Sequence, residues 1–164
     1  MQTILNLQAL TDKKKESLFT AIYIGGIFIV IALVYFLSAN LWDGLVNFFS
    51  SLTLAPVPAT GISLPAPAYP AAHINLYMAA FQFAIALGIL EIIILFLRVW
   101  LHSSVTRLAE TIENIVFWLG TSYLTATYLA NMRIPSDWFV FWAGIILIFG
   151  LALVARSFVI FAKR

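Results

Sequence analysis

The chain has 164 residues, of which 63% are hydrophobic and only 10% are charged, and its formal net charge is +2. Soluble domains average about 45–50% apolar and about 25% charged residues, so a soluble fold of this size could not cover so much apolar side chain. The chain has no cysteine, which excludes disulfides, and its basic runs are too short for a nucleic-acid-binding surface. This composition predicts an all-α integral membrane protein.

The first element expected along the chain is a short amphipathic helix before the lysines at 13–15. Four apolar residues share one face of it: Ile4, Leu5, Leu7 and Leu10. This face predicts an anchor in the membrane interface, and a disordered tail is the alternative. Asp12 is then a suitable N-cap for the helix that carries the lysines into the first span.

Four stretches are long and apolar enough to cross a bilayer, since a spanning helix needs about 20 mostly apolar residues. They lie at approximately 18–38, 76–101, 112–132 and 138–162. Ser136 and Asp137, after Pro135, favour a helix start there, with a carboxylate in the positive first turn. We therefore expect a single membrane domain, a bundle of four transmembrane helices with short interfacial helices beside it.

The segment between the first two predicted spans has two parts and contains no lysine or arginine. Asn40, Asp43, Asn47 and Ser50 recur at helical spacing, which predicts a helix in the membrane surface or a polar-striped extension of the first span. The proline-rich part, about 53–74, predicts an extended, stiff loop, because proline is excluded from the interiors of helices and sheets. This loop is either a connector or a cap over the outer mouth of an assembly.

The basic residues predict the orientation of the bundle in the cell membrane. Of the nine lysines and arginines, only Arg133 falls on one side of the predicted spans. The others fall on the opposite side: Lys13, Lys14, Lys15, Arg98, Arg107, Arg156, Lys163 and Arg164. By the positive-inside rule, both termini and the turn at 102–111 are cytoplasmic.

Glu91 is the one carboxylate near the middle of the second predicted span. A charged side chain at that depth costs about 3 kcal/mol, which the surrounding apolar side chains outweigh, so insertion tolerates Glu91 without explaining it. The residue shares a helical face with Ala80, Ala84 and Gly88, whose small size allows another helix to approach closely. We therefore expect Glu91 in a helix interface or a cavity, with Arg98, about 10 Å further along, reaching the cytoplasmic surface.

Polar side chains follow one face of the third predicted span. They recur at steps of four and three residues: Thr111, Asn114, Thr121, Thr125 and Tyr128, with Trp118 among them. In one interpretation, a protonated Glu91 donates a structural hydrogen bond to a threonine or tyrosine of this stripe. In the other, Glu91 and the stripe line a wet path for ions or protons. Four charged residues form the expected cytoplasmic rim: Arg98, Arg107, Glu110 and Glu113.

No motif of enzyme chemistry occurs, and no cofactor, metal site or catalytic residue is predicted. His73 and His102 flank the second span about 43 Å apart, so one chain cannot pair them on a metal. The favoured hypothesis is a small oligomeric membrane protein that forms an ion channel or a transport bundle for ions or small solutes. The alternative is a non-catalytic accessory subunit of a larger membrane complex, for example respiratory, which the packable residues Ala21 and Gly25 favour. The expected partners are the lipid bilayer and either further copies of the chain or other subunits.

Overall fold

The computed structural model describes residues 2–132, 134 and 136–162, and the side chains from residue 13 onward. The structure is 80% helical, which confirms the helical class. The chain runs through the following elements: α1 (Gln2–Leu37), α2 (Leu41–Ser50), β1 (Leu52–Pro56), β2 (Ser63–Pro67), the 3-10 turn η1 (Pro70–His73), α3 (Ile74–Trp100), α4 (Val105–Leu124), the π-helical turn η2 (Thr125–Leu129) and α5 (Ser136–Ala162).

Three segments of the described chain are helical, long and apolar enough to cross a membrane. They are Lys13–Leu37, Pro70–Trp100 and Ser136–Ala162. Large apolar side chains on all three are exposed, as expected of surfaces that face lipid rather than water. The third predicted span corresponds to the second half of α4 and to η2. Helix α4 is not among the three, because it carries three charged residues within 20 positions: Arg107, Glu110 and Glu113.

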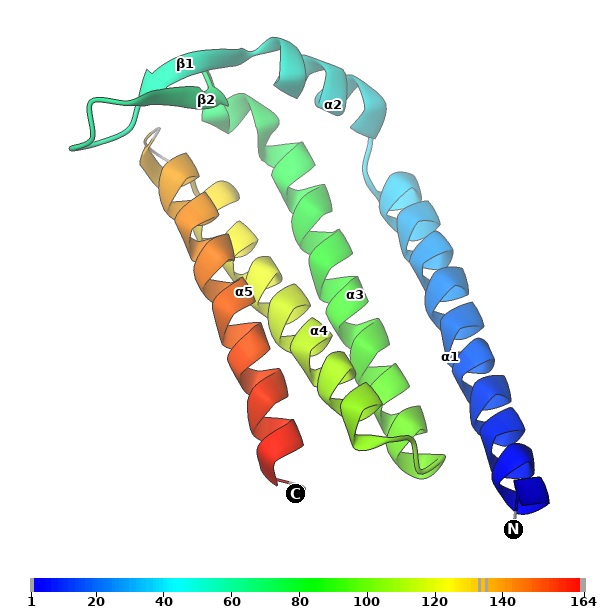
Figure 1. Ribbon diagram of the computed structural model, residues 1–164. Coiled ribbons are helices and arrows are strands. Elements are labelled where there is room, and N and C mark those ends of the chain that lie inside the picture. The colour runs from blue at the N-terminus through cyan, green and yellow to red at the C-terminus, as the bar shows by residue number, and fades with distance from the viewer. Residues whose placement is uncertain (1, 133, 135, 163–164) are drawn as a thin grey trace.

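The four long helices lie side by side, with the start of α1, the end of α5 and the α3–α4 turn at one end of the molecule (Figure 1). Helix α4 packs against both α3 and α5, and α1 packs mainly against α3. Helix α2 and the strands cross the opposite end (Figure 1). Three residues used to predict the orientation lie outside the described residues: Arg133, Lys163 and Arg164.

Glycine allows the close approach of neighbouring helices at several crossings. A Cβ atom placed on Gly88 of α3 would lie 2.5 Å from Cδ2 of Leu119 on α4. A Cβ atom on Gly120 of α4 would lie 2.6 Å from Cγ2 of Ile148 on α5. Cβ atoms essentially never lie so close to another atom, so an alanine at either position would require the facing Leu119 or Ile148 side chain to shift.

The residues that favour an accessory subunit, Ala21 and Gly25, were expected to pack against other subunits, and this stays a prediction because a single chain does not test it. Ala21 and Gly25 are exposed, and a Cβ atom on Gly25 would meet nothing within 4 Å. The close contact belongs to Gly26, whose Cβ would lie 2.6 Å from Cδ2 of Leu90 on α3. Two adjacent helical residues are about 100° apart around the axis, so a shift of one position turns a packed residue toward lipid.

Helix α1 is continuous from Gln2 to Leu37, so the expected separate helix before the lysines and the N-cap at Asp12 are both wrong. No glycine or proline interrupts this stretch before Gly25, so nothing in the backbone ends the helix near residue 12. The apolar face predicted for residues 4–10 lies outside the described side chains.

The helix predicted between the first two spans is present as α2. It is separate from α1 because Asn40 adopts a left-handed backbone conformation with φ 55°, which asparagine tolerates better than most residues. The break turns the chain so that α2 lies across the end of the bundle (Figure 1). The alternative of a polar-striped extension of the first span is therefore wrong.

The expected extended proline-rich loop is instead an antiparallel hairpin of β1 and β2. Flanking backbone hydrogen bonds join Val57 N to Ile62 O and Ala68 N to Ser51 O, which identifies the hydrogen-bonded pairs of the ladder. The strand prolines lie in the alternate pairs: Pro56, Pro65 and Pro67. Backbone nitrogens in those pairs face away from the partner strand, so proline removes no ladder hydrogen bond.

The hairpin is docked on the same chain. Trp138 at the start of α5 donates a hydrogen bond from Nε1 to the backbone oxygen of Pro65, at 3.1 Å. Ala66 in β2 is buried. These contacts hold the hairpin over the end of the bundle that carries α2 (Figure 1).

Candidate functional site

Glu91 lies in a polar cavity of about 130 Å³ between α1, α3 and α4. Each helix contributes three lining residues: Phe19, Thr20 and Tyr23 from α1, Glu91, Ile94 and Arg98 from α3, and Glu110, Thr111 and Asn114 from α4. The spacing of three or four residues on each helix places one face of each toward the same space. We call this space the Glu91 cavity.

The Glu91 side chain is 2% exposed, as expected from its interfacial position. Its Oε1 atom accepts a hydrogen bond of 2.8 Å from Nδ2 of Asn114, so its partner on α4 is an amide and not the threonine or tyrosine that we expected. An amide N–H can donate to a neutral or to an ionised carboxyl group. The hydrogen bond from Asn114 therefore does not require Glu91 to be protonated. A hydrogen bond donated by Glu91 to a threonine or tyrosine hydroxyl would require a protonated carboxyl group.

Two aromatic side chains lie one to two helical turns from Asn114 and Glu91 on the side toward α2. The rings of Phe83 on α3 and Trp118 on α4 meet edge to face at 6.0 Å between centroids. Trp118 also packs against the buried cluster between α1 and α3 that contains Leu87 and Val30. The polar groups of the cavity are thus separated from the opposite end of the bundle by an apolar layer.

The polar stripe of the third predicted span divides at this apolar layer. Thr111 and Asn114 line the Glu91 cavity, whereas Thr121 and Thr125 lie beyond Trp118. The hydroxyls of Thr111 and Thr125 donate to the backbone oxygens of Arg107 and Thr121 on their own helix, both over one turn. Such local bonds satisfy a hydroxyl in an apolar setting.

Two further members of the stripe behave differently. The hydroxyl oxygen of Thr121 is buried and has no hydrogen-bond partner in the described part of the chain. Tyr128, in η2, packs against the apolar cluster of Tyr77, Leu124 and Phe141.

On the packing face predicted for the second span, Ala84 and Gly88 are buried and Ala80 is exposed. Tyr77 and Leu87 are buried on the same side instead. Helical spacing places Ala80 on this face, but burial also requires a partner at the same level of the bundle. No described residue covers Ala80.

The four residues expected at the rim belong to one network of ion pairs at the end of the Glu91 cavity. Arg107 contacts Glu110 at 2.9 Å. Glu113 pairs with Arg156 of α5 at 3.0 Å. The hydrogen bond to Glu110, together with the charges of Glu110 and Glu16, raises the pKa of the Arg107 guanidinium.

Two further charged residues complete this network. Arg156 also approaches Glu110 at 3.6 Å, and Glu16 of α1 contacts both Arg98 and Arg107 at 3.5 Å. Sequence analysis missed Glu16 as a rim residue. Its position directly after the lysines, at the same end of its helix as the other charges, was the available signal. The network joins all four long helices, and Glu16 supplies the carboxylate of α1.

Arg98 belongs to both the network and the Glu91 cavity. Its side chain is only 13% exposed, and its guanidinium carbon lies 5.1 Å from the centroid of the Phe19 ring. It donates from Nη1 to the backbone oxygen of Arg107 at 3.0 Å. Arg98 therefore brings a positive charge into the cavity that holds Glu91, rather than extending freely to the surface.

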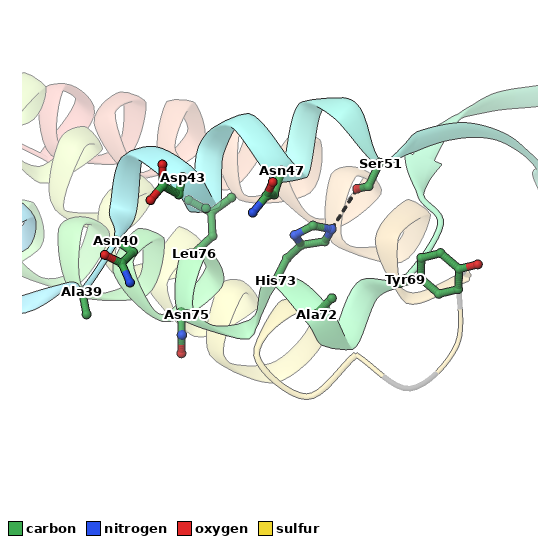
Figure 2. Close-up of a pocket in the computed structure, with 11 residues that line it drawn as sticks. Ala39, Asn40, Asp43, Asn47, Ser51, Tyr69, Ala72, His73, Asn75 and Leu76 are labelled. Atoms are coloured by element: carbon green, nitrogen blue, oxygen red, sulfur yellow. Dashed lines mark hydrogen bonds between the residues drawn. The ribbon is translucent and has the colours of Figure 1, made fainter.

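A second, larger pocket of about 540 Å³ lies at the opposite end of the molecule, between α2 and the start of α3 (Figure 2). Four lining residues follow one stripe of α2 and its flanks: Asn40, Asp43, Asn47 and Ser51. Ser51 and His73 are joined by a hydrogen bond of 2.8 Å between Oγ and Nε2. The predicted stripe ended at Ser50, but Ser50 is exposed and bonds its own helix backbone.

Comparison of the chain with protein-family models, curated proteins and solved structures finds no match.

Proposed function

We propose that the protein is a cation transport protein of the membrane in which Glu91 carries the transported ion. The observation that supports this proposal best is the buried carboxylate at the inner end of a polar cavity whose outer end is lined by Arg98 and Glu110. Ionisable residues inside a membrane are costly, and they typically mark ion or proton pathways.

A proton is the cation that this cavity accommodates best. Glu91 is the one carboxylate at the inner end, and Arg98 adds a positive charge to the same space. A metal cation prefers several oxygen ligands and would be repelled by the arginine. A carboxylate can instead accept a proton and remain hydrogen-bonded to Asn114 in both states.

Transport also requires a path beyond the apolar layer of Phe83 and Trp118. Helix α1 forms one wall of the Glu91 cavity and packs mainly against α3. A displacement of α1 would connect the cavity to Thr121 and Thr125 without separating α3, α4 and α5. The hydroxyls of these threonines would then supply partial dipoles along the route.

The membrane arrangement that we propose has four spans, with α4 and η2 forming the third in chain order, and with both termini in the cytoplasm. The short turn between α3 and α4 supports this arrangement, because it returns the chain antiparallel into the bundle. The charged network lies at the predicted cytoplasmic end, where an excess of basic residues is expected. Exposed apolar faces on α1 and α5 leave room for the homo-oligomer that the sequence suggested.

Proton flux into liposomes tests this function. Purified protein is reconstituted with a pH-sensitive dye inside the vesicles, and a potassium diffusion potential drives protons inward. We expect wild-type protein to conduct and Glu91→Gln to lower the flux at least about tenfold, because it removes the proton-carrying group. Glutamine keeps the volume and an oxygen that accepts from Asn114, so assembly and thermal stability should change little.

Glu113→Gln is the matched control. It makes the same chemical change in the same chain, but Glu113 pairs with Arg156 and does not line the Glu91 cavity. Its flux should stay near that of wild type. If wild-type protein conducts no cation under any gradient and purifies with other subunits, the transport proposal fails and the accessory-subunit alternative replaces it.

A further inference from the structure

The pocket between α2 and the start of α3 is the largest described cavity that the proposed function does not use. Its volume of about 540 Å³ lies within the range of about 300–1,000 Å³ that is typical of small-molecule sites. One side is the polar stripe of α2, and the other is η1 with the first turn of α3 (Figure 2). We call it the α2 groove.

The polar side chains of the α2 groove keep most of their hydrogen-bonding capacity. Within the described part of the chain, no hydrogen bond or ion pair involves the side chain of Asn40, Asp43, Asn47 or Asn75. Each carboxamide offers two N–H donors and a carbonyl acceptor, and Asp43 adds two acceptor oxygens. The hydrogen bond between Ser51 and the buried His73 joins the end of α2 to η1 within the lining of the groove.

The charges of the lining exclude several classes of ligand. No lysine or arginine lines the groove, and none occurs between Lys15 and Arg98, so a phosphate or carboxylate would find no cation. Asp43 is the one acidic side chain in the lining, too few for a divalent cation that prefers several carboxylates. Groups that both donate and accept fit a neutral ligand rich in hydroxyls.

The position of the groove indicates where such a ligand comes from. Helix α2 turns Trp42, Val46 and Phe49 outward, each more than half exposed. These apolar residues are spaced four and three apart, so they form the face of an interfacial helix that enters the lipid surface. The polar face of the same helix then lies at the level of the lipid headgroups, beside the exposed ring of Tyr69.

We propose that the α2 groove binds a polyhydroxylated ligand, a sugar, either as the headgroup of a glycolipid or as a free saccharide. Carboxamides and a carboxylate bind vicinal hydroxyls as donors and acceptors together, and Tyr69 offers an apolar ring face to the C–H side of a pyranose. This proposal does not depend on proton transport through the Glu91 cavity.

Binding is measured on the full chain in phosphatidylcholine nanodiscs, because detergents with sugar headgroups would compete. Maltose is titrated calorimetrically as the free saccharide. In a second arm, nanodiscs contain either galactosyl diacylglycerol or phosphatidylglycerol, and native mass spectrometry detects the retained lipid. Maltose binding would indicate a free saccharide, and selective retention of the galactolipid would indicate a headgroup; either result supports the proposal.

Three variants locate the site. Asn47→Leu keeps the branched shape of the side chain but removes its hydrogen bonds, and we expect it to weaken binding at least about tenfold. Asp43→Asn keeps the shape but replaces one acceptor oxygen by an N–H donor, so sugar binding should weaken, by less than in Asn47→Leu. Ser50→Ala, one residue outside the lining on the same helix, is the control and should bind as wild type does.

The proposal is overturned if wild-type protein binds neither maltose nor the galactolipid in preference to phosphatidylglycerol. It is also overturned if sugar binding is unchanged in Asn47→Leu, because the sugar would then occupy another site. A third contrary result is binding of tetramethylammonium, used as a cationic probe, in place of sugars and its loss in Asp43→Asn.

Discussion

Replacing Gly88 tests whether the α3–α4 interface depends on close helix approach. A new Cβ atom there would lie 2.5 Å from Cδ2 and 3.0 Å from Cγ of Leu119, well inside van der Waals contact. Overpacking of this kind costs about 1–3 kcal/mol. Alanine regains about 1 kcal/mol from its higher helix propensity, so Gly88→Ala should be close to neutral or destabilising by up to about 2 kcal/mol. Gly88→Leu puts three more carbon atoms in the same space and should cost more than about 3 kcal/mol.

Gly25 provides a matched control for these substitutions. It lies in the middle of a long apolar helix, as Gly88 does, but a Cβ atom there would meet nothing within 4 Å. Gly25→Ala should therefore stabilise the protein by up to about 1 kcal/mol through helix propensity alone. The two alanine variants should differ by roughly 1–3 kcal/mol, which corresponds to about 2–12 °C in Tm for a protein of this size.

The assay is a thermal scan of each purified variant in the same detergent at the same heating rate. The double variant Gly88→Leu with Leu119→Ala should recover part of the loss, because removing the Leu119 side chain frees the space that the new leucine needs. Equal Tm shifts for the Gly88 and Gly25 variants would refute the reasoning. So would a complete absence of recovery in the double variant.

Three further predictions concern the ends of the bundle. Glu16→Gln removes the carboxylate by which α1 contacts the arginines of α3 and α4, and should lower Tm by a few degrees in low salt and by less in 1 M salt, because salt screens partly exposed ion pairs. Trp138→Phe removes the hydrogen bond to Pro65, worth about 0.5–1.5 kcal/mol, and should speed proteolysis of the hairpin while leaving the overall Tm nearly unchanged. Cysteine at Thr60 should react with an impermeant reagent from outside intact cells, and cysteine at Ser104 should react only after lysis; the opposite pattern would reverse the topology.

Part of the candidate site could be predicted from the positions of individual residues in the sequence. The burial of Glu91 follows from its depth in an apolar helix, and its pairing with α4 follows from the one polar stripe available to it. The identity of its partner does not follow, because Asn114, Thr111 and Trp118 share that stripe and only the rotation and depth of α4 against α3 select the amide. The contribution of α1 to the Glu91 cavity was not predicted either, since isolated residues such as Thr20 and Tyr23 form no polar stripe along the first span.

The amino-acid sequence by itself determined which segments are helical and apolar, where the charges gather, and that residues 41–50 form a helix with a polar stripe. These features depend on local composition and on periodicity, which a single chain segment carries. Tertiary structure alone decided that Gly26 rather than Gly25 is packed, that Ala80 is exposed, and that the proline-rich segment pairs as a hairpin. Each of these features depends on which residue of a neighbouring segment lies in contact with the residue in question. Such contacts are set by how two segments pack together, and the sequence of one segment alone does not specify them.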